Sequence, residues 1–266
     1  MNRTGGKGVP RGDFDPGNGK PMIITENLTK IFRDKKRGEV RAVDGIDFQC
    51  FPGQIYGLLG ANGAGKTTTL RLLATILQPT SGTARVAGYD LNTQPEMVRR
   101  NIGFLSTATA LYGRLTARET VEYFGRLGGQ NGSALAERIE EIFDLLGIQE
   151  FASRRCDKLS TGMKQKVSIA RTLVNDPDVM ILDEPTVGLD VMTSRTIVRF
   201  IKDCRSRGKT VILSTHVMSE AEKLCDTIGI IHAGKLLAEG SLEELRGKTG
   251  LDDLEEIFIR TVGLTE

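Results

Sequence analysis

The 266-residue sequence predicts an α/β fold built on a mainly parallel sheet. Short apolar strands alternate with helices through the last third of the chain, at 179–182, 210–214 and 227–231. Nearer the N-terminus the pattern is different: apolar residues at 46, 48 and 50 alternate with polar ones, which is typical of an antiparallel element with one exposed face. The middle of the chain is helical. We therefore expect an α/β core with an N-terminal antiparallel β-subdomain and a helical insertion.

Local patterns predict the elements of the first part of the chain. Residues 1–21 contain six Gly and three Pro and little to bury, so we expect a disordered tail. The basic stretch 33–41 lies between two strand-like runs and predicts a solvated hairpin or loop. An apolar strand at 55–59 runs into a glycine-rich loop and then a helix at 66–77, which a turn at 78–82 follows.

The later helices follow from spacing and capping residues. One face of the middle helix carries the apolar residues Leu135, Ile139, Ile142 and Leu146. Gly147 is placed to end that helix. Two further helices are expected at 193–207 and 219–225, between the last strands. Ser241 and Glu244 have the spacing of a capping box and predict another short helix.

Composition disfavours several classes of function. The chain has 36 Lys and Arg against 34 Asp and Glu, and residues 1–21 hold four of these cations and two of these anions, so 32 of each remain. Bulk charge therefore does not support a nucleic-acid partner. The sequence lacks both a secretory signal and an apolar run near the roughly 20 residues that span a membrane. Four scattered cysteines without C-x-x-C spacing favour a reduced, cytoplasmic protein.

A phosphate-binding motif follows the strand at 55–59. Residues 60–67 read GANGAGKT, a complete G-x-x-x-x-G-K-[ST]. The glycines allow backbone amides to point at phosphate oxygens, and the next helix adds the positive end of its dipole. Lys66 supplies a charge for the β- and γ-phosphates, and the Thr67 hydroxyl a ligand for Mg²⁺. We expect the nucleotide to contact Gly60, Ala61, Asn62, Gly63, Ala64, Gly65, Lys66, Thr67 and Thr68.

An acidic pair follows the apolar strand at 179–182. The carboxyl end of a buried parallel strand lies at the crevice where ligands bind in α/β folds. We expect Asp183 to hold Mg²⁺ through its water and Glu184 to polarise the attacking water as general base. With the glycine loop, this pair predicts a P-loop NTPase core that hydrolyses a nucleoside triphosphate.

A third motif indicates which family of P-loop NTPases the sequence resembles. Residues 159–166 read LSTGMKQK. Here the sequence resembles the ATP-binding-cassette (ABC) family, whose signature LSGGQ is matched with changes at its third and fifth positions. Ser160 is placed to cap a helix whose N-terminus, with the Gly162 amide, faces an anion. The resemblance implies that this anion is the γ-phosphate held by a second subunit, so that ATP is sandwiched between two copies.

The resemblance covers almost all of residues 22–263, with the motifs in the family's order. It implies a tail at 1–21, an ABC ATPase domain at 22–246 with a helical subdomain at about 107–175, and a C-terminal helical extension at 247–266. It implies that Phe32 stacks on adenine, the alternative being a core aromatic. It also implies that Asp190 lies in a loop that contacts the opposite subunit, and that His216 senses the γ-phosphate.

One position departs from the family. Where family members carry Gln after a short strand, residues 102–107 read IGFLST and end at Thr107. In the family that Gln helps to organise Mg²⁺ and water, so the resemblance assigns Thr107 to the metal site. The threonine hydroxyl has a shorter reach. Either Thr107 does a reduced version of the task, or hydrolysis is tuned differently.

Local matches point to a branch of the family. Residues 111–126, the LSTGMKQK segment and residues 254–263 resemble the NatA-type sodium- and drug-export ATPases. The resemblance implies a subunit that dimerises around ATP and drives a separate membrane permease from the inner face of the membrane. Tyr112 and Arg114 either help to form the face that receives the permease or pack locally. Few residues follow 235, which argues against the appended domain of many importers and favours export.

The alternative is a soluble ABC ATPase that acts in translation or DNA maintenance. Members that maintain DNA insert long coiled coils between the phosphate loop and the signature. Here Thr67 and Leu159 are only 92 positions apart and the intervening sequence shows no sustained heptads. Members that act in translation usually carry two cassettes on one chain. The transporter subunit is therefore favoured.

The departure at Thr107 yields a testable prediction. Thr107→Gln should change the basal ATPase rate by less than about tenfold, because either side chain can bind a water molecule. Steady-state release of phosphate by the two purified proteins measures this change. A collapse of the rate in the variant would contradict the prediction.

Overall fold

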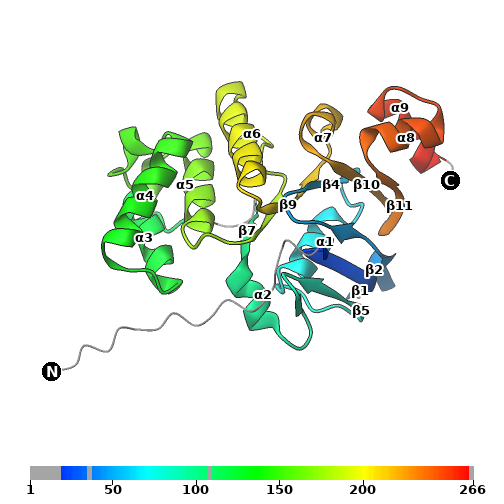
Figure 1. Ribbon diagram of the computed structural model, residues 1–266, viewed down its shortest axis with the longest axis horizontal. Helices are drawn as coiled ribbons and strands as arrows, with labels where there is room; N and C mark the ends of the chain where they lie inside the picture. The colour runs from blue at the N-terminus through cyan, green and yellow to red at the C-terminus, as the bar shows by residue number, and fades with distance from the viewer. Residues whose placement is uncertain (1–18, 35–37, 107–109, 264–266) are drawn as a thin grey trace.

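The computed structural model of this protein describes residues 19–34, 38–106 and 110–263 (Figure 1). Most of the expected tail at 1–21 and the whole of Thr107 lie outside these ranges. The described residues form two sheets and a set of helices. They confirm the predicted α/β fold, with its antiparallel N-terminal part and its helical insertion.

A six-stranded sheet lies at the centre, in the order β11-β10-β4-β9-β8-β7. Its strands are β4 (Ile55–Leu59), β7 (Ile102–Leu105), β8 (Val179–Asp183), β9 (Thr210–Thr215), β10 (Thr227–His232) and β11 (Lys235–Gly240). All neighbours are parallel except β10 and β11, which form a hairpin. Every residue of β4, β8 and β9 is buried, as expected for parallel strands covered on both faces.

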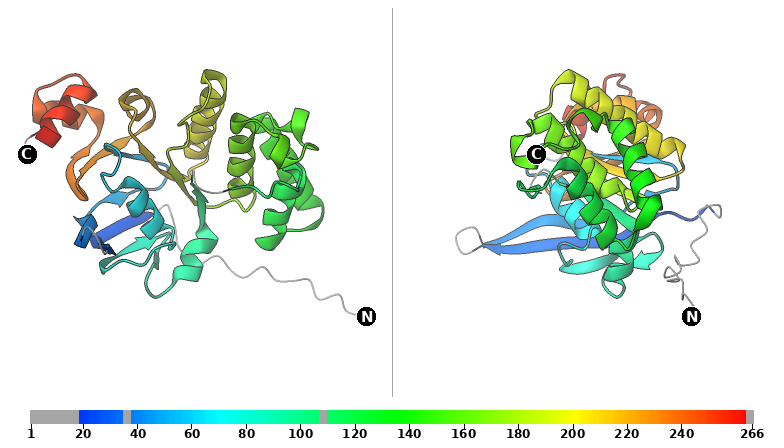
Figure 2. Two further views of the ribbon diagram at one scale, coloured as in Figure 1. Left: turned by 180° about the vertical axis from the view of Figure 1, so that it is seen from behind. Right: turned by 90° about the vertical axis from the view of Figure 1, so that its left-hand side faces the viewer.

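The second sheet is antiparallel and precedes the core in the chain. Its strands are β1 (Ile23–Asp34), β2 (Gly38–Ile46), β3 (Gln49–Cys50), β5 (Ser81–Val86) and β6 (Tyr89–Asp90). The described residues of the basic stretch, 33–34 and 38–41, lie in the predicted hairpin, in which β1 pairs with β2. Figure 2 shows this hairpin extending from the body of the molecule. The predicted burial of Ile46, Phe48 and Cys50 is confirmed, but they do not share one strand: Ile46 ends β2, Cys50 ends β3, and Phe48 lies in the link between these strands.

The two faces of the central sheet are covered differently. On one face lie α1 (Lys66–Leu73) and the antiparallel sheet, and on the other lie α6 (Val191–Ser206) and α7 (Met218–Leu224) (Figure 1). The short helix α2 (Pro95–Asn101) leads into β7. Because the helices and the antiparallel sheet cover both faces, the loops that follow the parallel strands lie at the strand ends.

Helix α1 ends earlier than the sequence predicts. The predicted helix ran to residue 77, whereas α1 ends at Leu73. Thr75 has a φ of 57°, and the amides of Ile76 and Leu77 both donate to the Arg71 carbonyl. The apolar run suggested a longer helix, but Ile76 is exposed and does not belong to its buried face.

The helical insertion consists of α3 (Ala117–Leu127), α4 (Gly132–Leu146) and α5 (Thr161–Leu173), with two short 3₁₀ helices at Gln149–Phe151 and Cys156–Lys158. All four apolar residues predicted on one face of the middle helix are buried in α4. Gly147 ends this helix with a φ of 62°, as predicted.

The chain closes with α8 (Leu242–Thr249) and α9 (Leu254–Gly263). Ser241 and Glu244 form the predicted capping box at the start of α8. Leu245, Leu254 and Ile257 pack with residues of β10 and α7 in one apolar cluster. The division expected at 246/247 falls inside α8, and the division into domains stays a prediction. No helix within the three described ranges combines the length and apolar character that crossing a membrane requires.

Close packing at Gly57 in β4 yields a second prediction. A Cβ at this position would lie 2.5 Å from the Cys225 Sγ. Gly57→Ala should therefore lower the free energy of unfolding by about 1–3 kcal/mol, measured by urea denaturation. Because Cys225→Ala removes the clashing sulfur, the double variant should lose less than the sum of the two single variants. Simple additivity would show that the sulfur is not the obstacle.

Candidate functional site

The phosphate loop joins the C-terminal end of β4 to the start of α1. Gly63 and Gly65 have left-handed backbone, with φ of 83° and 111°. A Cβ at Gly60 would lie 2.4 Å from the Ile231 carbonyl oxygen, and one at Gly65 would lie 2.4 Å from the Ala42 carbonyl oxygen. Glycine is therefore required at these turns. Helix α1 starts without a side-chain cap and without an acid in its first turn, so its N-terminus suits an anion.

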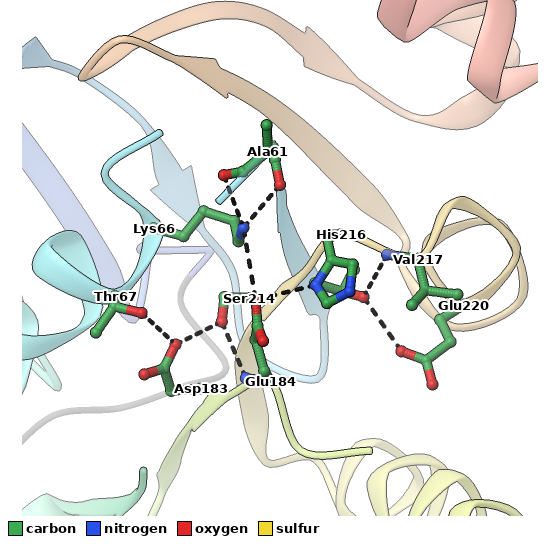
Figure 3. Close-up of polar contacts among 11 residues, drawn as sticks. Ala61, Lys66, Thr67, Asp183, Glu184, Ser214, His216, Val217 and Glu220 are labelled. Carbon is green, nitrogen blue, oxygen red and sulfur yellow. Dashed lines mark hydrogen bonds and ion pairs between the residues drawn. The ribbon is translucent and has the colours of Figure 1, made fainter. Parts of the chain in front are cut away.

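Lys66 is the first residue of α1, and its side chain is buried. Its Nζ donates to the carbonyl oxygens of Gly60 at 2.7 Å and Ala61 at 3.1 Å, and lies 3.6 Å from the Glu184 Oε1 (Figure 3). Burial lowers the pKa of the Lys66 ammonium, and the carboxylates of Glu184 and Asp183 oppose that effect. The ammonium is thus held among oxygen atoms at the loop.

Asp183 ends β8 and is almost fully buried. Its Oδ1 accepts a hydrogen bond from the Thr67 Oγ1 at 2.9 Å and another from the Ser214 Oγ at 2.7 Å. The Thr67 hydroxyl and the Asp183 carboxylate are hard oxygen donors of the kind that Mg²⁺ prefers. Their proximity, brought about by α1 and β8, fits the predicted metal site.

Glu184 follows β8 directly and has a φ of 47°, which is unusual for a residue with a Cβ. Its amide donates to the Ser214 Oγ at 3.0 Å. Its Oε1 lies 3.1 Å from the His216 Nδ1. A dashed line marks this contact in Figure 3. The three residues predicted to be catalytic, Lys66, Glu184 and His216, therefore meet around one carboxylate.

The turn after β9 places His216. The Thr215 Oγ1 donates to the Glu220 Oε2 at 3.2 Å and accepts from the Val217 amide at 3.0 Å. These bonds join the end of β9 to the start of α7. Ser214, Thr215 and Glu220 belong to none of the motifs that predicted site residues. Two consecutive hydroxyl residues directly after the apolar run 211–213 were the signal that could have indicated the first two.

Three predicted residues lie together elsewhere. Ser160 caps α5, as predicted, by accepting from the Met163 amide. Asp190 caps α6: its Oδ1 accepts from the Thr193 amide at 2.9 Å and its Oδ2 from the Thr193 hydroxyl at 2.7 Å. These two bonds lower the pKa of the Asp190 carboxyl. A Cβ at Gly162 would lie 2.9 Å from the Thr193 Oγ1, so the two helix starts are in close contact.

We call Ser160, Gly162 and Asp190, with Thr193, the signature cluster. Figure 1 shows α5 set apart from α1, with β7 between them. Within one copy of the chain, the helix that carries Ser160 and Gly162 is therefore separate from the helix that follows the phosphate loop.

The remaining predicted residues lie at the surface or outside the described ranges. Phe32 is 38% exposed on β1, so it is not a core aromatic, and the Lys30 Nζ lies 5.3 Å from its ring centroid. Tyr112 is exposed, and its ring packs edge-on against that of Tyr123 at 6.1 Å between centroids. Arg114 is exposed as well. Thr107, assigned to the metal site by resemblance, lies outside the described residues.

Comparison with known proteins agrees with this geometry. The sequence profile of the ABC transporter family matches residues 43–187. The ABC transporter ATP-binding protein NatA of Bacillus subtilis (strain 168) is 41% identical over 239 residues, which cover 90% of this chain and 97% of NatA. The daunorubicin/doxorubicin resistance ATP-binding protein DrrA of Streptomyces peucetius is 38% identical over 228 residues, covering 86% of this chain and 68% of DrrA.

A solved structure has the same fold. It is a dimeric ATP-binding cassette in a post-hydrolysis state bound to ADP and Pi, and it is 27% identical to this chain. The two superpose with a TM-score of 0.76 over 83% of this chain and 98% of the cassette. The resemblance inferred from the motifs and the P-loop fold are both confirmed. The chain belongs to the ABC transporter family and is one of its ATP-binding, ATP-hydrolysing proteins.

Proposed function

We propose that this chain is the motor subunit of an export-type ABC transporter, in which Glu184 is the general base for ATP hydrolysis. The observation that carries the proposal is the meeting of Lys66, Glu184 and His216 at the ends of β4, β8 and β9. Two copies of the chain bind ATP between them and act on a separate membrane permease. The subunit is then held at the inner face of the membrane by that permease.

The residues of the site have distinct tasks. The loop from Gly60 to Thr68 receives the phosphates, and Lys66 exchanges its contacts with loop carbonyls for phosphate oxygens. The Glu184 carboxylate accepts a proton from the attacking water. His216, 3.1 Å from that carboxylate, keeps it oriented toward the phosphate. The exposed ring of Phe32 stacks on adenine.

Thr67 and Asp183 hold Mg²⁺ in this proposal. The Thr67 Oγ1 and the Asp183 Oδ1 are 2.9 Å apart, and the two residues belong to α1 and β8. When bound, Mg²⁺ offsets the negative charge that develops on the transferred phosphoryl group. The assignment of Thr107 to the same metal site rests on the resemblance alone.

The separation of α5, which begins in the signature cluster, from α1 supports a homodimer. Ser160 and Asp190 are exposed, and so are three apolar side chains beside them, Val187, Val191 and Met192. Exposed apolar groups that gather near polar ones mark contact surfaces. In the proposed dimer this surface faces the phosphate loop of the other copy. The dimeric cassette bound to ADP and Pi is a precedent within the family.

The transported substrate is proposed from the relatives. DrrA is named for resistance to daunorubicin and doxorubicin, and the local matches at 111–126 and 254–263 resemble sodium- and drug-export ATPases. We assign Na⁺ or a drug-like compound as the exported substrate. The exposed Tyr112, packed on Tyr123, and the exposed Arg114 form part of the proposed permease face.

Replacement of the base tests the chemistry. Glu184→Gln should bind ATP but lower kcat by about 10²–10⁴-fold, because an amide of the same shape cannot accept the proton. The variant should also accumulate as an ATP-bound dimer in size-exclusion chromatography. Glu140→Gln is the matched control, since Glu140 pairs with Arg118 in the helical insertion, and it should keep the parent rate. Turnover by Glu184→Gln at the parent rate would show that Glu184 is not the base.

Copurification from membranes tests the partner. A tagged parent chain should recover an integral membrane protein from detergent extracts. A variant with Asp substituted at both Tyr112 and Tyr123 should recover much less of it, because two carboxylates cannot be buried there without a partner charge. Its unchanged melting temperature and ATPase rate would show that the fold is intact. Recovery of ribosomes instead of a membrane protein would favour the soluble alternative.

A further inference from the structure

Ser214 lies between the two acids of the site. It is the penultimate residue of β9, is fully buried, and is paired in register with Asp183 of β8. Its hydroxyl donates to the Asp183 Oδ1 at 2.7 Å and accepts from the Glu184 amide at 3.0 Å (Figure 3). A hydroxyl has one proton to donate, so the bond to Asp183 fixes the direction of that proton. One buried atom thus joins the two consecutive acids.

Asp183 depends on Ser214 for its orientation. Two hydroxyls donate to the Asp183 Oδ1, one from Thr67 and one from Ser214. Thr67 is a proposed ligand of Mg²⁺, whereas Ser214 belongs to the neighbouring strand and has no such task. Hydrogen-bond partners of a metal-binding carboxylate orient it and tune its affinity for the metal. Ser214 is placed to perform that role for Asp183.

Glu184 depends on the same hydroxyl. Its left-handed backbone, with a φ of 47°, is disfavoured for any residue that has a Cβ. The following peptides are held by other groups: the Val187 amide donates to the Glu184 carbonyl, and the Gln165 Nε2 donates to the Pro185 carbonyl at 2.8 Å. Ser214 holds the amide of Glu184 itself. This bond helps to keep the turn that aims the carboxylate at Lys66 and His216.

We propose that Ser214 is a positioning residue, which holds the metal-side acid and the general base in one fixed arrangement. The proposal deepens the proposed function and rests on its assignment of Asp183 and Glu184. It implies a particular combination of defects. Removing this hydroxyl should weaken the response to Mg²⁺ and slow turnover together, while ATP affinity changes little.

The test compares Ser214→Ala with Thr210→Val. Both residues lie on β9 and are fully buried, but the Thr210 hydroxyl donates to the Phe51 carbonyl at the opposite end of the strand. Each substitution deletes one buried hydroxyl at nearly constant volume. Ser214→Ala should lower kcat by about 10–100-fold, raise the Mg²⁺ concentration for half-maximal rate, and leave the KM for ATP within about threefold. Thr210→Val should keep kcat within about twofold of the parent.

A measurement without turnover accompanies the kinetics. Ligand binding raises the melting temperature of the folded state, so the difference between ATP with Mg²⁺ and ATP with EDTA reports on the metal. That difference should shrink in Ser214→Ala and stay at the parent value in Thr210→Val. Where Ser214→Ala does not fold, Ser214→Cys replaces it, because a thiol is a poor donor of similar shape, and the same direction of change is expected.

Two results would overturn the proposal. One is a Ser214 variant with the kcat and Mg²⁺ dependence of the parent. The other is an equal loss in Thr210→Val, which would indicate a general effect of destabilising β9. Failure of the proposed function gives a different result, since Glu184→Gln would then turn over at the parent rate whatever the Ser214 variants do.

Discussion

The parallel, in-register pairing of β4, β9 and β8 is the constraint on which the candidate site depends. Leu59 of β4 pairs with Thr215 of β9, and Ser214 pairs with Asp183 of β8. The residues that follow the three strands therefore lie together at the C-terminal ends of these strands: the phosphate loop after β4, Glu184 after β8 and His216 after β9. Successive side chains on a strand point to opposite faces, so a slip of one residue would turn Asp183 away from Thr67. Full burial of the three strands makes such a slip costly.

In this register, oxygen atoms surround the buried ammonium of Lys66 and compensate for its loss of contact with water. A buried ammonium is stable only when it is paired and hydrogen-bonded. The loop supplies the carbonyls of Gly60 and Ala61, and β8 supplies the Glu184 carboxylate. A phosphate that enters the loop competes with these partners for the ammonium. The carbonyls and the carboxylate that stabilise the lysine charge are thus the same groups with which a bound phosphate competes.

The sequence predicted the parts of this site that depend on short motifs. Lys66, Thr67, Asp183 and Glu184 were found because a glycine-rich loop and an acidic pair each follow an apolar strand. Ser214 was not predicted because its contact with Asp183 depends on the register between β8 and β9, which the sequence does not reveal. The left-handed backbone of Glu184 and of Thr75 was equally hidden, since neither is a glycine. Thr75 also explains why the predicted end of α1 was wrong.

Helix α5 connects the signature cluster to the segment at Glu184, the proposed base, within a single chain. Its N-terminus contributes Ser160 and Gly162 to the cluster, and one turn later its Gln165 donates to the Pro185 carbonyl, next to Glu184. In the proposed homodimer the N-terminus of α5 faces the nucleotide held by the other copy. A displacement of α5 would therefore act on the peptide between Pro185 and Thr186, while Ser214 holds the amide of Glu184 from the sheet. The segment at Glu184 thus has one support from the central sheet and another from the helical insertion, so the position of this proposed base depends on how the insertion sits against the core.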